Sequence, residues 1–255
     1  MTKPTILFVP GAWHTPAHYQ SFLQKLQDAG YSTSSKQLPS VGAAEPEKQT
    51  VAADAAFIRE NLLLPDIEQG KDVILIMHSY GGCPGADAAK GLSKAERTAA
   101  GKTGGIVGLI FMCAFVANEG DSLRSKLPGN KLDPWNILDE ETGQITVDKP
   151  EEVFYNGIDS GLADVAVKGL KKQAHTSFIT PSGPPAWKDE VFNGRRAYIK
   201  CQKDRAIPYI AQNMVTSLSG LEWHELDLDS SHSPFLTHGD QMLKFIDERV
   251  EEWVS

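Results

Sequence analysis

Short apolar runs alternate with amphipathic segments along most of the chain. The pattern predicts strands at residues 5–9, 31–38, 72–77, 106–116, 196–202 and 221–228. It predicts helices at residues 17–29, 49–64, 80–91, 209–218 and 235–254. The run at 106–116, IVGLIFMCAFV, is apolar throughout, as in a strand covered on both faces. Strands that alternate with helices in this way predict an α/β fold with a doubly wound, mostly parallel sheet.

The region between the fourth and fifth predicted strands breaks this alternation. Residues 117–190 are rich in Asp, Glu, Gly and Pro, with a short strand pattern in GQITVDK and a helical one in DVAVKGLKKQ. A structureless loop of this length is uncommon in a compact domain. We therefore expect an inserted lid at residues 117–190, and a core formed by residues 1–116 and 191–255.

Composition and charge restrict the class of protein. The chain is 41% hydrophobic and 23% charged, as in ordinary globular proteins. Its net charge of −8 argues against a nucleic acid or an anionic membrane as partner, because phosphate groups need a basic face. No apolar stretch reaches the roughly 20 residues needed to span a bilayer. The sequence shows no targeting segment, so we expect a cytoplasmic protein. We expect its three cysteines to be free thiols. A homodimer is compatible with the sequence.

The strand predicted at residues 72–77 runs directly into a histidine, a serine and two glycines. The pentapeptide MHSYG at residues 77–81 matches the G-x-S-x-G pattern of a nucleophile elbow, except that Met77 occupies the first glycine position. At such a turn the hydroxyl of Ser79 would lie near the free N–H groups of the next helix. The alternative is that Ser79 only caps this helix, a common role for serine there.

A serine hydroxyl needs a base and an orienting acid before it becomes a good nucleophile. His232 is the best candidate base, because it follows the last predicted strand, where parallel sheets place ligand-binding groups. Asp204 follows the strand at 196–202 and could bond one imidazole nitrogen of His232. Asp227 and Asp229 are the alternative acids, and an ordinary structural role is the alternative for each candidate.

The oxyanion of a tetrahedral intermediate needs two backbone N–H donors. We expect one from Tyr80, the residue after Ser79. We expect the other from Ala12, in the loop after the first strand, where Gly11 allows close approach of the backbone. A plain turn is the alternative for this loop.

The sequence resembles the α/β-hydrolase superfamily over essentially its whole length. The resembling segments are ILFVPGAWHTPAHYQSFLQKLQDAGY, VILIMHSYGG, TVDKPEEVFYNGIDSGLADVAVKGL, YIKCQKDRAIP and SSHSPF. They look closest to the branch of plant methylesterases, hydroxynitrile lyases and related microbial serine hydrolases. The resemblance implies that Ser79, Asp204 and His232 form a catalytic triad in the family's chain order. It also implies that Ala12 and Tyr80 form the oxyanion hole under a lid.

The resemblance also bears on the reaction and the pocket. Lyases of this branch carry a threonine in the first-strand loop and a lysine beside the catalytic histidine. Here these positions are Gly11 and Ser233, which favours a hydrolase. The residues expected to bind substrate are Gly11, Trp13, His14, Trp135, Phe154 and Tyr155.

We therefore expect a serine hydrolase that cleaves a carboxylic ester or lactone of a small, partly apolar molecule through an acyl-enzyme. The sequence contains neither a zinc-type Cys/His spacing nor a G-x-G-x-x-G loop, so we expect no metal and no organic cofactor. Two alternatives remain. One is a C–C lyase on the same scaffold, and the other is a small-molecule-binding protein of this fold without catalysis.

Overall fold

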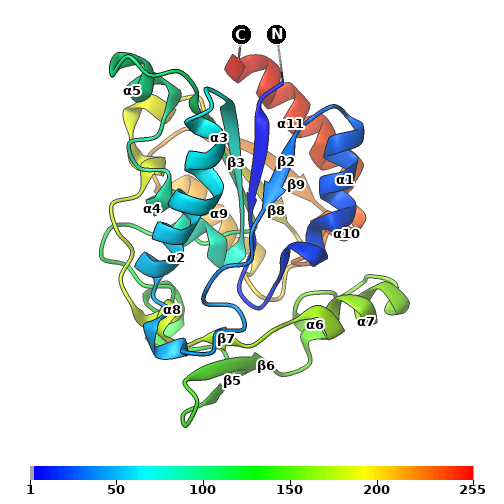
Figure 1. Cartoon of the computed structure of the whole chain (residues 1–255). Helices are drawn as coiled ribbons and strands as arrows, with labels where there is room; N and C mark the ends of the chain where they lie inside the picture. Colours follow the sequence, from blue (N-terminus) through cyan, green and yellow to red (C-terminus); the bar gives the residue numbers. More distant parts are fainter. Residues whose placement is uncertain (1–2, 255) are drawn as a thin grey trace.

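A parallel sheet of six strands runs through the centre of the molecule (Figure 1). The structure, a computed structural model, describes residues 3–254. The strand order is β2-β1-β3-β4-β8-β9, and every neighbouring pair is parallel. The strands are β1 Thr5–Val9, β2 Thr33–Ser35, β3 Asp72–His78, β4 Gly105–Met112, β8 Arg196–Cys201 and β9 His224–Leu228. The predicted α/β fold is confirmed.

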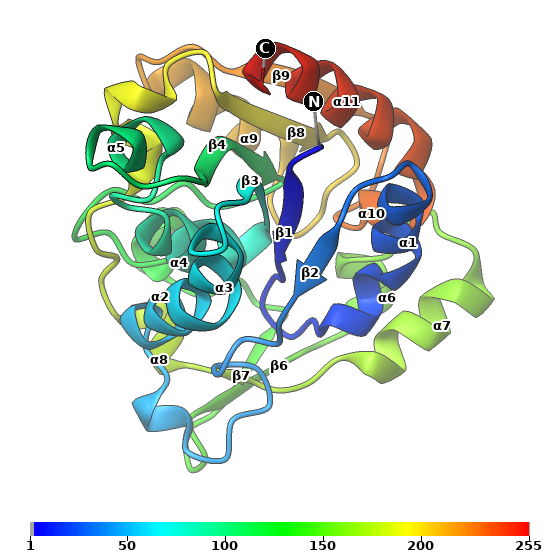
Figure 2. The same cartoon turned by 45° about the horizontal axis from the view of Figure 1, so that its top comes forward.

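Helices cover both faces of this sheet (Figure 2). They are α1 Gln20–Asp28, α2 Val51–Ile58, α3 Leu64–Ile67, α4 Gly82–Ala88, α5 Lys94–Ala99, α9 Tyr209–Leu218, α10 Pro234–Thr237 and α11 Gly239–Val254. Residues of α2, α3 and α4 share a core with Leu7 and Val9, whereas residues of α1 and α11 share one with Ile6 and Phe8. Alternate side chains of β1 therefore face opposite layers. No helix within residues 3–254 is long and apolar enough to cross a membrane.

The winding of the sheet reverses at β1. The chain passes from β1 to β2 on one side and then crosses to β3 on the other, so β1 and β3 are neighbours on either side of the reversal. Ligands of open α/β sheets bind outside the carboxyl ends of the strands at such a reversal. The loops that leave β1 and β3 here carry Gly11 and Ser79.

Several predicted elements differ in extent from the observed ones. The strand predicted at 31–38 shrinks to β2, and the helix predicted at 235–254 is divided into α10 and α11. The helix predicted at 49–64 consists of α2, a π turn at Arg59–Leu63 and α3. It continues past Pro65, because this proline lies in the first turn of α3, where a missing N–H is tolerated.

The segment between β4 and β8 has secondary structure of its own. It contains β5 Asn136–Asp139, β6 Gln144–Val147, α6 Pro150–Val153, α7 Ser160–Gly169, β7 Gln173–Ala174 and α8 Thr176–Ile179. The three strands form a separate antiparallel sheet. In Figure 1 this segment crosses the carboxyl end of the central sheet. The short strand and the helix predicted from GQITVDK and DVAVKGLKKQ are confirmed as β6 and α7.

Candidate active site

The turn after β3 places Ser79 at its apex. The chain passes from β3 into a 3-10 turn, Ser79–Gly81, and then into α4, so the helix predicted at 80–91 is shorter than expected. Ser79 has a φ of 52°, a left-handed conformation that costs a non-glycine residue about 1–3 kcal/mol. A Cβ on Gly82 would lie 2.2 Å from the Phe115 carbonyl oxygen, so the turn closes only with glycine there. A strained serine between a strand and a helix, with small neighbours, is the geometry of a nucleophile elbow.

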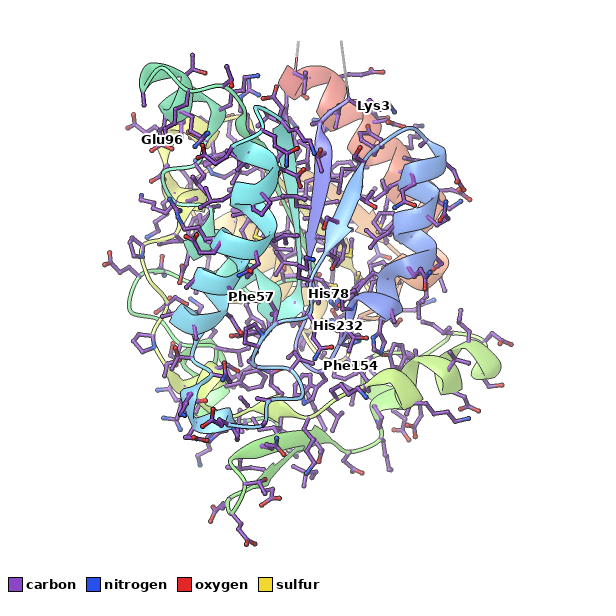
Figure 3. The ribbon with its side chains drawn as sticks, in the orientation of Figure 1. Lys3, Phe57, His78, Glu96, Phe154 and His232 are labelled. Atoms are coloured by element: carbon purple, nitrogen blue, oxygen red, sulfur yellow. The ribbon has the colours of Figure 1, made fainter. Side chains whose placement is uncertain are left out.

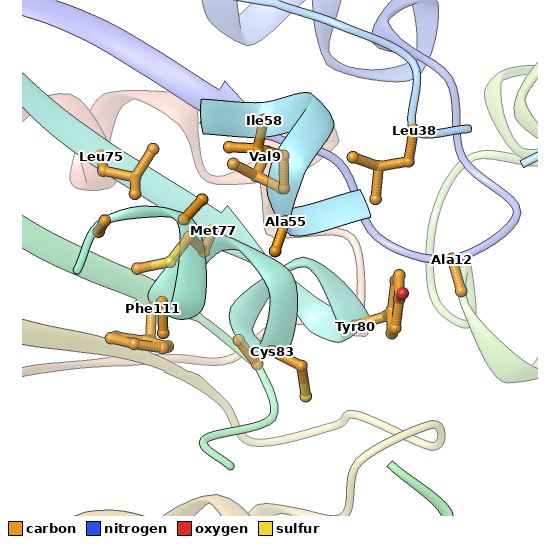
Figure 4. Packing of buried hydrophobic residues seen from close by; sticks show 14 of the residues in the cluster. Val9, Ala12, Leu38, Ala55, Ile58, Leu75, Met77, Tyr80, Cys83 and Phe111 are labelled. Carbon is orange, nitrogen blue, oxygen red and sulfur yellow. The ribbon is translucent and has the colours of Figure 1, made fainter. Parts of the chain in front are cut away.

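Met77, which replaces the usual first glycine of the motif, is accommodated by a glycine in the following helix. The Met77 side chain is buried on the α2–α4 side of the sheet, near Phe111 and Cys83 (Figure 4). A Cβ added to Gly85 of α4 would lie only 2.8 Å from Cγ and Sδ of Met77. The glycine that allows close approach of β3 and α4 is therefore Gly85 of the helix, whereas the usual motif has it in the strand.

Ser79, His232 and Asp204 form a continuous chain of hydrogen bonds. His232 Nε2 lies 2.9 Å from Ser79 Oγ, and His232 Nδ1 lies 2.7 Å from Asp204 Oδ2. The structure thus brings together the three residues predicted as a triad, although they are far apart in sequence. The alternative acids lie elsewhere, because Asp227 accepts a bond from Tyr209 and Asp229 pairs with Lys203.

The carboxylate of Asp204 is fixed by its own loop. Its Oδ1 accepts the backbone N–H groups of Ala206 and Ile207, both at 2.8 Å. Its Oδ2 accepts Gln212 Nε2 at 3.1 Å besides the imidazole of His232. Because ionised carboxylates only accept hydrogen bonds, this arrangement assigns the N–H of the imidazole to Nδ1 and leaves Nε2 as an acceptor for the Ser79 hydroxyl.

His78 connects the loop of His232 to the loop after β1. Its Nε2 lies 3.0 Å from the carbonyl oxygen of His232 and its Nδ1 lies 2.9 Å from the Tyr19 hydroxyl. The Tyr19 oxygen accepts the N–H of Gly11 at 3.0 Å. A carbonyl only accepts, so Nε2 donates and Nδ1 accepts from Tyr19. Burial holds the pKa of His78 well below its usual value, which keeps this ring neutral.

The position of His78 is visible in Figure 3, where His78 and His232 lie at the end of the sheet that faces Phe154 of the inserted segment. Sequence reasoning did not include His78 in the site. The residue before an elbow serine points away from the serine hydroxyl, and nothing in the sequence relates it to the loop after β9.

In the loop after β1, the N–H groups of Gly11, Trp13 and His14 have hydrogen-bond partners, whereas the Ala12 N–H has none among residues 3–254. Gly11 donates to Tyr19 and accepts from the N–H of His14. The Ala12 carbonyl accepts His14 Nδ1 at 2.7 Å, and Trp13 is bonded at both its N–H and its carbonyl. Within residues 3–254 no acceptor is bonded to the Ala12 N–H. This N–H is therefore available to a ligand.

Tyr80 supplies the second predicted donor. Its N–H lies in the first turn of the helical segment, where backbone N–H groups have no helical partner. Its hydroxyl donates to Asp54 Oδ2 at 2.7 Å, inside the protein. Burial raises the pKa of Tyr80 well above its usual value, so the hydroxyl stays protonated and remains a donor. Burial also raises the pKa of Asp54 to about 6.

A small pocket lies beside Ser79. Of the six residues predicted to bind substrate, Trp13, Trp135 and Phe154 line it. The other lining residues are Ala12, Ser79, Tyr80, Phe115, Leu123, Leu127, Asp133, Asn136, Phe178, Ala206 and Ile207. Most are apolar or aromatic, as in sites for small organic molecules. The aliphatic lining residues were not predicted from the sequence, because their spacing is the same as that of residues buried in a hydrophobic core.

The other three predicted substrate-binding residues, Gly11, His14 and Tyr155, are not among the residues that line this pocket. His14 is buried and bonded on both sides, through Nδ1 to the Ala12 carbonyl and through Nε2 to the Tyr155 hydroxyl at 3.0 Å. Burial holds the pKa of His14 well below its usual value. His14 and Tyr155 therefore support the loop that carries Ala12.

One cluster near the site has metal-ligating atoms close together. The ligand atoms of His78, Cys113 and His232 lie within 4.8 Å of one another. However, His78 Nε2 and Cys113 Sγ both donate to the His232 carbonyl oxygen. The two nitrogens of His232 are bonded to Ser79 and Asp204. The ligand atoms of these three residues are already used in hydrogen bonds, so they do not form a suitable metal site.

Comparison with known proteins gives consistent matches over most of the chain. The family model described as "Alpha/beta hydrolase family" matches residues 6–245. Alpha/beta hydrolase nvfD of Aspergillus novofumigatus is 31% identical over 258 residues, with 100% of both chains covered. A pyrethroid hydrolase from Sphingobium faniae has a TM-score of 0.70 at 19% identity, covering 97% of each chain. A methylesterase, MES16, from Arabidopsis has a TM-score of 0.70 at 17% identity, covering 97% of this chain and 99% of its own.

These matches agree with the observed architecture. The solved structures share the fold at low sequence identity, whereas the family model and the Aspergillus protein match in sequence along most or all of the chain. The chain therefore belongs to the alpha/beta hydrolase family and is a hydrolase.

Proposed function

We propose that this hydrolase cleaves carboxylic esters or lactones of small, partly apolar molecules, with Ser79 as nucleophile, His232 as base and Asp204 as orienting acid. The observation that carries the proposal is the hydrogen-bond chain of 2.9 Å and 2.7 Å through the two nitrogens of His232. A serine adjacent to a base, with the base held by a third group, is the requirement for nucleophilic catalysis by a hydroxyl.

In this mechanism His232 Nε2 takes the proton of Ser79 as its oxygen attacks the substrate carbonyl carbon. The carbonyl oxygen becomes an oxyanion and accepts the N–H groups of Ala12 and Tyr80. The C–O bond to the alcohol then breaks, and the alcohol leaves with the proton from the imidazolium. Water attacks the acyl-enzyme with His232 again as base, which releases the acid and restores the serine.

The pocket supports a substrate with an apolar body and one hydrogen-bond donor. The ring of Trp13 packs within 5.4–5.7 Å of those of Trp135, Phe154 and Phe178, measured between ring centroids. Asn136 contributes a buried Oδ1 without a hydrogen-bond partner among residues 3–254. A hydroxyl or amino group on the substrate could satisfy this oxygen, whose isolation otherwise costs about 1–3 kcal/mol.

We propose that residues 117–190 act as a lid over this pocket. Many of the lining residues come from this segment, among them Leu123, Trp135, Phe154 and Phe178. A cover of this kind would exclude water from the oxyanion, which strengthens its hydrogen bonds to the backbone. The core of residues 1–116 and 191–255 would then carry the reacting groups.

The test is to measure hydrolysis of a short-chain aryl ester beside cleavage of an aromatic cyanohydrin. We expect Ser79-dependent ester hydrolysis and no release of cyanide. The Ser79→Ala variant should lose activity, whereas Ser217→Ala, at an exposed serine on α9, should retain it. Cyanohydrin cleavage without ester hydrolysis would favour a lyase. Loss of neither activity in Ser79→Ala would contradict the assignment of the nucleophile.

A further inference from the structure

A group of buried polar side chains lies behind the predicted oxyanion hole and takes no part in the predicted triad. Ser40, Asp54 and Gln173, which we call the bracket, are each 0% exposed. Ser40 follows the β2 region, Asp54 lies on α2 and Gln173 lies on β7 of the inserted segment. Burial of three polar side chains is costly unless each is hydrogen bonded. Their hydrogen bonds lead to both oxyanion donors.

The first arm of the bracket holds Tyr80. Asp54 Oδ2 accepts the Tyr80 hydroxyl at 2.7 Å and the Ser40 hydroxyl at 2.5 Å, and Asp54 Oδ1 accepts the Ser40 N–H at 3.1 Å. Tyr80 is itself 0% exposed, and its hydroxyl ends on this buried carboxylate. The residue that carries one oxyanion N–H is thus fixed at its backbone and at the tip of its side chain.

The second arm holds Trp13, the residue after Ala12. Trp13 donates its N–H to Gln173 Oε1 at 3.2 Å and accepts the N–H of Lys171 at 2.9 Å. Its φ of 62° is left-handed, which is strained for a residue with a side chain. Gln173 Nε2 donates to Ser177 Oγ at 2.7 Å, so the orientation of this amide is fixed by its partners. The turn that aims the Ala12 N–H is therefore held by the inserted segment.

The two arms are joined. The N–H of Ala174, next to Gln173, donates to the Ser40 carbonyl oxygen at 2.9 Å. Ser40 also supplies two of the three donors to Asp54, and Val41 pairs with Gln173 as an isolated bridge. One continuous network therefore connects the side-chain hydroxyl of Tyr80 with the peptide between Ala12 and Trp13.

We propose that the bracket positions the oxyanion hole, with Asp54 acting through Tyr80 and Gln173 acting through Trp13. These are positioning residues, because neither reaches the reacting atoms. The inference rests on the proposed function. Oxyanion donors act at full strength only when held at the place where charge develops, and removal of one donor costs about 100- to 1000-fold in kcat. A donor displaced by loss of its support should cost less, about 10- to 30-fold.

The experiment compares Tyr80→Phe, Asp54→Asn and Gln173→Met with the native chain. For each we would measure kcat and KM on an aryl ester, the inhibition constant of an aryl trifluoromethyl ketone, and the thermal melting point. This ketone adds to a serine and forms an oxyanion, so its affinity reports the oxyanion hole. We expect kcat to fall about 10- to 30-fold with KM within about twofold, and the ketone to weaken by the same factor as kcat falls.

A matched control is Asp87→Asn on α4. Asp87 is also a carboxylate whose pKa is raised to about 6 by burial, and it accepts the Gly183 N–H at 2.6 Å, but it does not contact Tyr80. This variant should keep the native kcat. Gln173→Glu retains an acceptor for the Trp13 N–H and should recover part of the activity lost in Gln173→Met. Tyr80→Phe removes only the hydroxyl that is bonded to Asp54. It therefore tests the same hydrogen bond if Asp54→Asn does not fold.

The outcomes separate the inference from the proposed function. Folded variants with kcat and ketone affinity within twofold of native would overturn the role of the bracket while leaving the triad untouched. An equal loss in Asp87→Asn would also overturn it, because the effect would then be general destabilisation. Absence of Ser79-dependent hydrolysis in the native chain would overturn both proposals.

Discussion

The two halves of the candidate active site are supported by different parts of the chain. The proposed proton-transfer half consists of Ser79, His232 and Asp204, which follow β3, β9 and β8 of the central sheet. Its support is mostly local, since two amides of the same loop fix Asp204. The proposed oxyanion half consists of the N–H groups of Ala12 and Tyr80. Its support comes from α2 and from the inserted segment.

This difference indicates that the inserted segment contributes hydrogen bonds to the candidate site in addition to pocket side chains. Its early part contributes apolar side chains such as Leu127 and Trp135 to the pocket. In its late part Gln173 and Ser177 are fully buried, and Gln173 is hydrogen bonded both to Ser177 and to Trp13 in the loop after β1. Changes in the late part should therefore affect turnover through the oxyanion half, without any contact with the triad.

The largest expected effect comes from the proton-transfer half. His232→Ala removes the base, and Asp204→Asn leaves the imidazole without the partner that fixes its tautomer. Each should lower kcat by about 10⁴-fold or more while KM changes little. Steady-state kinetics on an aryl ester would measure this, with His238→Ala as the control. A loss of less than tenfold in His232→Ala would mean that this half does not transfer the proton.

A second prediction separates the halves by pH. Asp54, which supports the oxyanion half through Tyr80, has a pKa raised from 3.8 to about 6 by burial. The folded state therefore holds this proton more tightly than the unfolded state, and the free energy of unfolding falls as pH rises from about 4 to about 6. The loss is on the order of 3 kcal/mol and persists at higher pH. Asp54→Asn should lack this part of the fall in stability.

Denaturant unfolding of the native chain and the variant between pH 4 and 7 would measure this difference. Asp87→Asn should remove a fall of the same sign, because the pKa of Asp87 is also about 6, but a smaller one since Asp87 is partly exposed. Equal pH slopes for the native chain and Asp54→Asn would show that Asp54 is not a costly buried charge.

A third prediction concerns the elbow that both halves share. Gly85→Ala places a Cβ 2.8 Å from the Met77 side chain and overpacks the contact between β3 and α4. We expect a loss of about 1–3 kcal/mol in the free energy of unfolding. The double variant Met77→Gly with Gly85→Ala should lose less than the sum of the losses in the two single variants, because the added methyl group enters space that the Met77 side chain leaves. Strictly additive losses would contradict the close contact between these two positions.

The smallest expected effect concerns selectivity within the pocket. Asn136→Leu removes the unpartnered oxygen that a donor on the substrate could satisfy. We expect kcat/KM for a hydroxylated aryl ester to fall about tenfold relative to its deoxy counterpart. Parallel kinetics on the two esters would measure the ratio. An unchanged ratio would remove Asn136 from substrate recognition and leave both halves of the site as described.

The proton-transfer half could be predicted from the sequence because each of its members follows a strand. In a parallel sheet the carboxyl ends of all strands lie at one edge, so sequence position places Ser79, Asp204 and His232 at the same edge. The fold was also predictable, because continuous apolar runs identify the central strands β1, β3 and β4.

The support of the oxyanion half was not predicted, for two different reasons. For Asp54 the sequence did contain a signal that was not used. It lies three residues after Val51 and four before Ile58, so it is a carboxylate on the apolar face of its helix. Gln173 had no such signal, because its role depends on how the inserted segment returns across the loop after β1. Likewise α5 was missed, although Ser93 and Glu96 form a capping box.

The most direct test of the central claim is covalent labelling by a fluorophosphonate probe, followed by intact mass measurement and peptide mapping. The account predicts a single adduct on the native chain, located at Ser79, and no adduct on Ser79→Ala. An unlabelled native chain, or an adduct that persists in Ser79→Ala, would contradict it.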